Sequence, residues 1–341
     1  MLFNDYSYLL RNILMLSYLI SCYTFHAKLY KKLRNRIVKM SLLPRLVSTS
    51  VAIADHAGKL IRDIMSKGDL GIVTKEHAKD LQTKADRNAQ KCIIGSLQKH
   101  FPKIKIIGEE EEEGTSDNIV DPSSIKVLDI KCPPEYENLK EEEVVVWVDP
   151  LDGTAEYTEG LLDHVTVLIG IATGGKAIGG IIHQPYYNYQ NPGSPLGRTI
   201  WSTVGGNFGG ITLQSPPSDS FIVTTTRSHS SSTVNDAVAS VNPTQVLRVG
   251  GAGHKVLLLI EGKAHAYVFA SPGCKKWDTC APQAVLEAVG GTLADISGVP
   301  IPYDADAPHR NSTGVLAVAS GVNFTEVLNK IPEHVKNNLK A

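Results

Sequence analysis

Four carboxylates stand at predicted strand ends, in a predicted turn or at the start of a predicted helix. In the window VVVWVDPLDGTAEYTEG (Val144–Gly160), an apolar run ends at Asp149 and a second acid follows at Asp152. Because Pro150 has no N–H, we expect it to end the strand, and Asp152-Gly153-Thr154 is typical of a turn. A turn alone would explain the second acid. Two carboxylates at one point repel each other, however, so their spacing favours a divalent cation between them.

Two more acids extend this set. Glu109 follows the apolar run Ile104–Ile107 and Gly108, and Asp278 stands at the start of a predicted helix, where it could also be the N-cap. We expect the neighbouring acids Glu110–Glu113 to be a solvated charge run. Oxygen ligands without His or Cys select magnesium over zinc. Two such ions can clamp a phosphate and activate a water, which predicts hydrolysis without a covalent intermediate.

Hydrolysis also requires a group that orients the attacking water or takes its proton. Thr154 directly follows the metal loop. Asp86, at the start of a predicted helix in DLQTKAD, is its natural partner, and helix capping is the alternative role for this carboxylate. Lys255 and Arg248 are cations near a glycine-rich turn and suit a phosphate.

Helices and strands alternate along the chain and must position these residues. Their mixture indicates an α/β protein with two sheet-containing halves. Strands are predicted at 104–107, 144–148, 221–225 and 266–269, with a hairpin over 165–182, and helices at 43–68, 84–100, 233–241, 254–261 and 281–289. We divide the chain into an N-terminal extension, residues 1–39, and a catalytic unit, residues 40–335. The unit has a metal-binding half of about 40–215 and a substrate-binding half of about 216–335.

Charge and cysteine content exclude several classes of protein. Residues 1–39 carry seven Lys/Arg and one acid, a charge of +6, so the overall charge of −1 leaves −7 on residues 40–341. An acidic body argues against nucleic-acid binding. Five scattered cysteines indicate reduced thiols in a cytosol-like compartment. The apolar run 13–25 is short for a membrane span, which leaves an anchor, a targeting peptide, or a true start at Met40 as alternatives.

Several motifs together resemble a known family. The segments Gly108–Glu110 (GEE), Asp149–Thr154 (DPLDGT) and Trp277-Asp278 are similar to the three metal motifs of the lithium-sensitive, magnesium-dependent inositol monophosphatase superfamily. The flanking sequence resembles the 3′(2′),5′-bisphosphate nucleotidase branch of this superfamily over residues 40–335. The similar segments are GDLGIV (68–73), DLQTKADR (80–87), EYTEGLLD (156–163), TTTRSHS (224–230), RVGGAG (248–253) and ASPGCKKWDTCAP (270–282).

The resemblance implies a layered αβαβα sandwich and hydrolysis of the 3′-phosphate of adenosine 3′,5′-bisphosphate to AMP. It implies similar action on 3′-phosphoadenylyl sulfate and side activity on inositol 1,4-bisphosphate and inositol 1,3,4-trisphosphate, in sulfate assimilation and nucleotide metabolism. The residues carried over by motif fall into three groups: catalytic Asp86 and Thr154; ligands of two or three Mg²⁺ ions Glu109, Asp149, the Leu151 carbonyl, Asp152 and Asp278; and substrate-binding Gly153, Thr226, His229, Gly251 and Lys255.

The sequence departs from this pattern at two positions. Ala155 stands where relatives often carry a basic residue, and His254 where Asn is expected, so substrate affinity could differ. The metal loop reads Asp-Gly-Thr rather than the Asp-Ala-Thr of Golgi-type relatives, which favours a cytoplasmic protein. We expect a monomer with small-molecule substrates and neither nucleic-acid nor membrane partners. The alternatives are an inositol polyphosphate 1-phosphatase and a non-catalytic sensor of the bisphosphate nucleotide.

Overall fold

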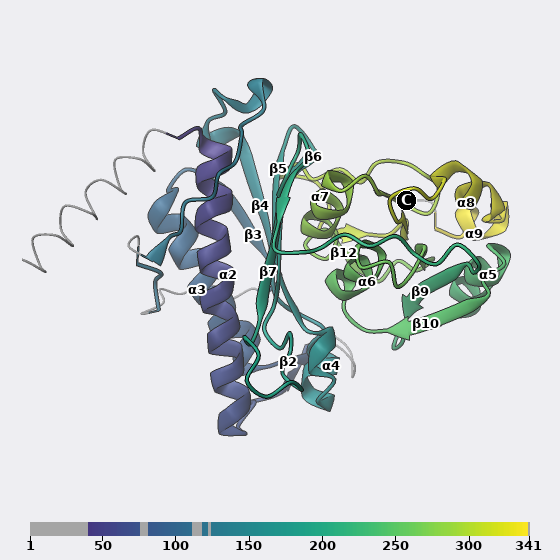
Figure 1. Ribbon diagram of the computed structural model, residues 1–341, viewed down its shortest axis with the longest axis horizontal. Helices are drawn as coiled ribbons and strands as arrows, with labels where there is room; N and C mark the ends of the chain where they lie inside the picture. The colour runs from purple at the N-terminus through teal and green to yellow at the C-terminus, as the bar shows by residue number, and fades with distance from the viewer. Residues whose placement is uncertain (1–39, 76–80, 111–117, 122–123, 340–341) are drawn as a thin grey trace, which may run out of the picture.

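The computed structural model describes residues 40–75, 81–110, 118–121 and 124–339. Five layers alternate as helices, sheet, helices, sheet and helices (Figure 1). This arrangement confirms the predicted αβαβα sandwich. The apolar run 13–25 and the extension that contains it lie outside the described residues.

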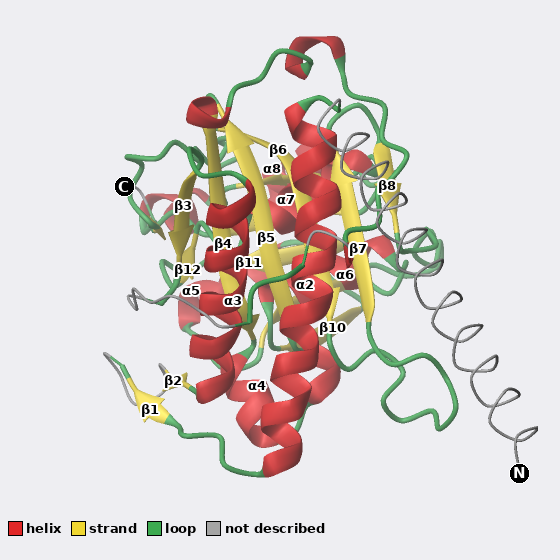
Figure 2. Cartoon of the chain, turned by 90° about the vertical axis from the view of Figure 1, so that its left-hand side faces the viewer, coloured by secondary structure: helices red, strands yellow, loops and turns green. Residues whose placement is uncertain are grey.

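The first layer contains two long helices that lie side by side on the first sheet (Figure 2). α2 (Leu42–Lys67) ends at Gly68, whose φ of 76° provides the left-handed C-cap expected of glycine. α3 (Lys84–His100) begins with a capping box in which the Thr83 hydroxyl accepts from the Asp86 N–H and the Asp86 carboxylate accepts from the Thr83 N–H. Both helices agree with their predicted ranges.

The first sheet has the strand order β3-β4-β5-β6-β7-β8. β3 runs parallel to β4, and each later strand is antiparallel to the one before it. The β5–β6 hairpin turns at Gly174 and Gly175, with φ of 52° and 71°, as predicted. The strands are β3 (Lys105–Gly108), β4 (Val144–Asp152), β5 (Thr166–Thr173), β6 (Lys176–Gln184), β7 (Arg198–Thr203) and β8 (Asn207–Gly209).

β4 corrects one prediction. The strand does not end at Pro150 but continues to Asp152, which pairs with Thr166 of β5. The pairing register shifts between Asp149 and Asp152, so the proline lies in an irregular stretch where no ladder hydrogen bond is required of it. The bend brings both carboxylates to the same end of the strand.

The second sheet has the strand order β10-β9-β11-β15-β13, with β10, β9 and β11 parallel and β15 and β13 antiparallel to their neighbours. Predicted strands at 221–225 and 266–269 correspond to β9 and β11; β10, β13 and β15 were not predicted. The strands are β9 (Ile222–Thr226), β10 (Gln245–Val249), β11 (Ala266–Phe269), β13 (Thr292–Ala294) and β15 (Val315–Val318).

The remaining helices separate and cover the sheets. α6 (Ala252–Ile260) and α7 (Cys280–Ala288) lie between them, and α5 (Ser232–Ser240), α8 (Phe324–Lys330) and α9 (Glu333–Asn337) cover the far side of the second sheet (Figure 1). One apolar core lies beneath α2 and α3 and another spans the two sheets and α6 and α7. Shorter elements are α4 (Thr154–Glu159), β1 (Val73–Thr74), β2 (Leu81–Gln82), β12 (Cys274–Lys275) and β14 (Arg310–Asn311).

No helix within the described ranges is both long and apolar enough to span a membrane.

Candidate active site

One pocket receives residues from both sheets. The ends of β3, β4, β9 and β10 and the segment before α7 contribute to its wall, so positions far apart in the chain meet there. Among the residues predicted for the site, the pocket is lined by Glu109, Asp149, Leu151, Asp152, Gly153, Thr154, Thr226, His229, Gly251, Lys255 and Asp278. Asp86 does not line it and reaches the pocket through Thr154.

Four of the five carboxylates that line the pocket, all but Glu156, lie close enough to repel one another. Burial, with repulsion from Asp278 and Glu110, raises the pKa of Glu109 to about 8 even though Lys75 opposes this change. Burial and repulsion from Glu109, Asp152 and Asp278 raise the pKa of Asp149 well above its usual range. Burial likewise raises the pKa of Asp278 to about 6. Their ionised forms need a cation.

Backbone contacts fix the positions of two of these acids. Glu109 donates its N–H to the Val148 carbonyl at 3.1 Å, which continues the parallel pairing of β3 with β4 and puts its side chain beside Asp149. The Asp149 carboxylate accepts the Leu151 N–H at 3.0 Å. The irregular end of β4 is therefore held by the acid that precedes it.

Asp152 is held by the first turn of α6. Its two carboxylate oxygens accept the N–H groups of Ala252 and Gly253, at 2.7 and 2.8 Å, and one of them also accepts the Thr166 hydroxyl at 2.6 Å. The partial positive charge of a helix N-terminus stabilises an anion there. The acid from the first sheet is thereby fixed to a helix that precedes the second sheet's central strand.

The structure excludes the alternative capping role of Asp278 and corrects the prediction that Glu110 is solvated. Asp278 does not cap α7, whose N-cap is Thr279; its carboxylate accepts the Lys275 N–H at 2.7 Å. Glu110 is not solvated but 6% exposed, and Gln90 holds its backbone N–H and carbonyl. No periodic signal distinguishes Glu110 in the sequence, because the adjoining acids 111–113 extend the charge run; those three lie outside the described residues.

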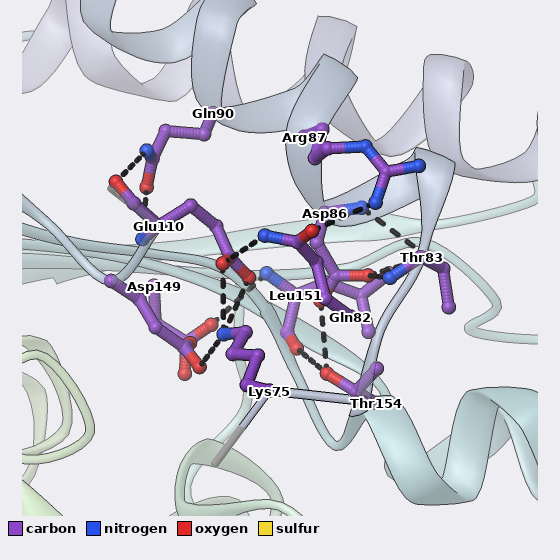
Figure 3. Close-up of polar contacts among 11 residues, drawn as sticks. Lys75, Gln82, Thr83, Asp86, Arg87, Gln90, Glu110, Asp149, Leu151 and Thr154 are labelled. Atoms are coloured by element: carbon purple, nitrogen blue, oxygen red, sulfur yellow. Dashed lines mark hydrogen bonds and ion pairs between the residues drawn. The ribbon is translucent and has the colours of Figure 1, made fainter. Parts of the chain in front are cut away.

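Lys75 was missed by sequence reasoning. Its ammonium lies 3.0 Å from a Glu109 oxygen and 2.8 Å from a Glu110 oxygen, and Figure 3 shows it directed toward Glu110, near Asp149. The Gln82 amide donates to the same Glu110 carboxylate. Its own oxygen accepts a hydrogen bond from Arg87 at 2.8 Å. No local signal in the sequence marks this contact, because Lys75 lies 34 and 35 positions from the two acids.

The carboxylates fit a hard cation by their chemistry. In the part of the chain that the structure describes, no three acidic, His or Cys side chains are arranged to hold a metal ion as they stand. The donor set is nevertheless oxygen-only, buried and short of positive charge, with Lys75 as the cation that contacts Glu109. Those are the properties of a site for Mg²⁺.

Asp86 and Thr154 meet at the edge of the pocket. The Thr154 hydroxyl lies 2.9 Å from one Asp86 oxygen and 3.1 Å from the Leu151 carbonyl (Figure 3). The other Asp86 oxygen accepts the Thr83 N–H at 2.8 Å, so this carboxylate caps α3 and contacts Thr154 at the same time. Burial raises the pKa of Asp86 to about 6, against the hydrogen bonds from Thr83. A base with such a pKa suits proton transfer near neutrality.

The predicted substrate residues gather on the opposite wall. Lys255 is 6% exposed; its ammonium contacts the Gly251 carbonyl at 2.9 Å and lies 5.4 Å from the centre of the Tyr267 ring. The Thr226 hydroxyl accepts the His229 N–H at 3.1 Å, which orders the turn between them. Arg248 is different. It contacts Asn235 at 2.8 Å and does not line the pocket.

The two departures from the resemblance have different settings. Ala155 lines the pocket, whereas the His254 ring stacks on His164 with ring centres 4.5 Å apart. Burial and the neighbouring His164 lower the pKa of His254 to about 3, so the His254 ring is uncharged at neutral pH. His254 therefore contributes packing behind the first turn of α6 rather than a charge in the pocket.

The sequence and the fold are both similar to those of known proteins. The model of the inositol monophosphatase family matches residues 43–336. The chain is 55% identical to 3′(2′),5′-bisphosphate nucleotidase 1 of Rattus norvegicus, over 88% of this chain and 98% of that protein. Among solved structures, it is similar to the extragenic suppressor protein suhB of Bartonella henselae, with a TM-score of 0.60, 20% identity, and coverage of 82% and 96%. An IMPase/NADP phosphatase complexed with Mg²⁺ and phosphate has a TM-score of 0.57 at 17% identity, with coverage of 80% and 90%.

Proposed function

The chain belongs to the inositol monophosphatase family, and from this premise we propose that it hydrolyses the 3′-phosphate of adenosine 3′,5′-bisphosphate to AMP and phosphate. Its action on 3′-phosphoadenylyl sulfate gives adenylyl sulfate. The observation that carries the proposal is the Thr154–Asp86 contact at the edge of a pocket that also holds the four predicted metal-binding carboxylates and the predicted nucleotide residues. The 55% identical relative bears the name of this activity.

Magnesium dependence is general in this family, and we propose two or three Mg²⁺ ions for this chain. Glu109, Asp149, the Leu151 carbonyl, Asp152 and Asp278 would hold them. Bound there, the ions would supply a charge clamp for the phosphate and activation of a water. The oxygen-only set and the raised pKa values of its acids support this assignment.

The chain's own groups perform the remaining tasks. Thr154 orients the attacking water and passes a proton toward Asp86, whose pKa of about 6 lets it accept that proton near neutral pH. Lys255 offsets phosphate charge from the opposite wall. Thr226, His229, Gly251 and the backbone of Gly153 bind the nucleotide.

We also propose a division of labour between residues 40–215 and 216–335. The first segment supplies three of the metal-binding acids from the ends of β3 and β4, and the second supplies most of the nucleotide residues from the ends of β9 and β10 and from α6. There are two exceptions: the second segment contributes Asp278 to the metal site, and the first contributes Gly153 to the nucleotide site. Catalysis then depends on both segments packing around one pocket. We further propose a cytoplasmic monomer.

The test is phosphate release by the full chain in Mg²⁺, with adenosine 3′,5′-bisphosphate and inositol 1,4-bisphosphate at equal concentrations. Preference for the nucleotide supports the proposal. Preference for the inositol phosphate would instead identify an inositol polyphosphate 1-phosphatase that uses the same site. Nucleotide binding without release of phosphate would indicate the sensor, against which the complete carboxylate set argues.

A further inference from the structure

Glu156 is a buried carboxylate that the proposed mechanism does not use. It lies in α4, two residues after Thr154, and it lines the pocket. The residue is 3% exposed. Arg227, which follows β9, donates to it from Nε at 3.2 Å and from Nη2 at 3.0 Å. Both bonds reach the same oxygen, Oε1. The pair therefore joins a helix that follows the first sheet's β4 to the loop that carries Thr226 and His229.

The second oxygen of Glu156 is in a different position. Among the described residues, no hydrogen bond reaches Oε2. It lies against two glycines of the pocket wall: a Cβ added to Gly250 would fall 1.9 Å from the Glu156 carboxyl carbon, and one added to Gly153 would lie 3.6 Å from Oε2. Glycine at 250 is thus what lets the backbone approach this carboxylate so closely.

Oε2 is not among the fully enclosed side-chain atoms that lack a partner, so it is open to the pocket. A ligand that displaces water from this oxygen must therefore supply a donor to it, since a carboxylate oxygen left without one is costly. An ionised phosphate cannot supply this donor, because two anions repel each other. A hydroxyl can, and in a 3′-phosphorylated ribonucleotide the 2′-hydroxyl lies next to the scissile phosphate.

Resting on the proposed function, we propose that Glu156 Oε2 accepts a hydrogen bond from the hydroxyl adjacent to the scissile phosphate, the 2′-hydroxyl of adenosine 3′,5′-bisphosphate. Glu156 is then a substrate-binding residue that distinguishes a ribonucleotide from its 2′-deoxy analogue. Its position between the metal loop, at Gly153, and the predicted nucleotide segment, at Gly250, is where that hydroxyl would lie. A site that binds a substrate hydroxyl discriminates against the analogue that lacks it, since its own group is left unpaired.

The experiment compares kcat/KM for adenosine 3′,5′-bisphosphate and its 2′-deoxy analogue, in Mg²⁺, for the full chain and two variants. Glu156→Met removes both oxygens at similar side-chain length. Glu159→Met is the matched control, because Glu159 also contacts Arg227, at 2.8 Å, but its side chain is 52% exposed and outside the pocket. In the wild type and in Glu159→Met, kcat/KM should be at least tenfold higher for the ribonucleotide than for its 2′-deoxy analogue. In Glu156→Met, the two kcat/KM values should agree within twofold.

Two outcomes overturn the proposal. One is a wild type that does not prefer the ribonucleotide over its 2′-deoxy analogue; this measurement needs no variant, so it holds even if Glu156→Met fails to fold. The other is a folded Glu156→Met that keeps the wild-type preference. Hydrolysis of p-nitrophenyl phosphate but not of the nucleotide would overturn the proposed substrate instead. The subsite is then decided with inositol 1,4-bisphosphate, for which Glu156→Met should lose at least tenfold more kcat/KM than for p-nitrophenyl phosphate. Equal losses on both would overturn it.

Discussion

The Thr154 hydroxyl lies 2.9 Å from the Asp86 carboxylate, although 68 residues separate the two in the chain. Asp86 comes from the first turn of α3, and Thr154 from the first turn of α4, at the end of β4. Their contact links the helix layer to the metal loop. Because burial also raises the pKa of Asp86 to about 6, one pair of side chains brings together an acceptor of suitable pKa and a hydroxyl directed at it.

Removing the Asp86 carboxylate or the Thr154 hydroxyl should slow turnover about 10²–10⁴-fold, the usual contribution of a positioned acid or base. We expect this for Asp86→Asn and Thr154→Val, while Thr154→Ser keeps much of the rate because it keeps the hydroxyl. Wild-type kcat should fall as pH drops through about 6, as Asp86 becomes protonated. Steady-state kinetics from pH 5 to 8.5 would measure this. Thr158→Val is the control, since the Thr158 hydroxyl contacts the Ala155 carbonyl instead.

Asp149→Asn should abolish turnover by more than it weakens substrate binding. The change removes a ligand charge from the centre of the carboxylate set, whereas the nucleotide residues on the opposite wall stay intact. Steady-state rates and calorimetric titration with AMP would separate the two effects. An unchanged rate would disprove the assignment of Asp149 as a metal ligand. Glu142→Gln is a surface control, because Glu142 pairs only with the exposed Lys103 among described residues.

The stability of the metal-free protein should fall as pH rises from about 4.5 to 8. Glu109 and Asp278 have folded-state pKa values of about 8 and about 6, above their unfolded values, so the folded chain binds more protons in this window. Their ionisation on raising the pH therefore favours unfolding. Mg²⁺ requires the ionised carboxylates, and its stabilising effect should be larger at pH 8 than at pH 6.

Thermal unfolding with EDTA and with 5–10 mM Mg²⁺, followed by circular dichroism at the two pH values, tests this dependence; the concentration range is an order-of-magnitude choice for a weakly held hard cation. Asp149→Asn should lose most of the Mg²⁺-dependent rise in Tm. A rise in Tm that is the same at both pH values would show that the buried carboxylates do not control metal binding.

Lithium at millimolar concentration should inhibit phosphate release, as family membership suggests. A small hard cation competes for the same oxygen ligands but brings half the charge of Mg²⁺ to them. Initial rates at fixed Mg²⁺ with increasing LiCl would measure the effect, and NaCl at equal ionic strength is the control. Equal responses to the two salts would separate this chain from the usual behaviour of its family.

The sequence by itself determined several of the elements that surround the site. α2 follows from apolar periodicity with Gly68 at its end, α3 lies at its predicted range, and β5 and β6 follow from two apolar runs around Gly174-Gly175. These signals are local, because caps, turns and periodic burial each involve residues within a few positions of one another. The type and spacing of Asp149 and Asp152 also predicted a hard-cation site before any distance was known.

Only the tertiary structure decided which groups meet. Lys75 contacts Glu109 and Glu110 across more than 30 positions, Asp152 is held by the first turn of α6 about 100 positions away, and Glu156 pairs with Arg227 after an interval of 71. Burial of Glu110 likewise depends on Gln90, which belongs to another element. Such contacts leave no periodic trace in the sequence, because the order of strands in the sheets, rather than spacing along the chain, brings their ends together.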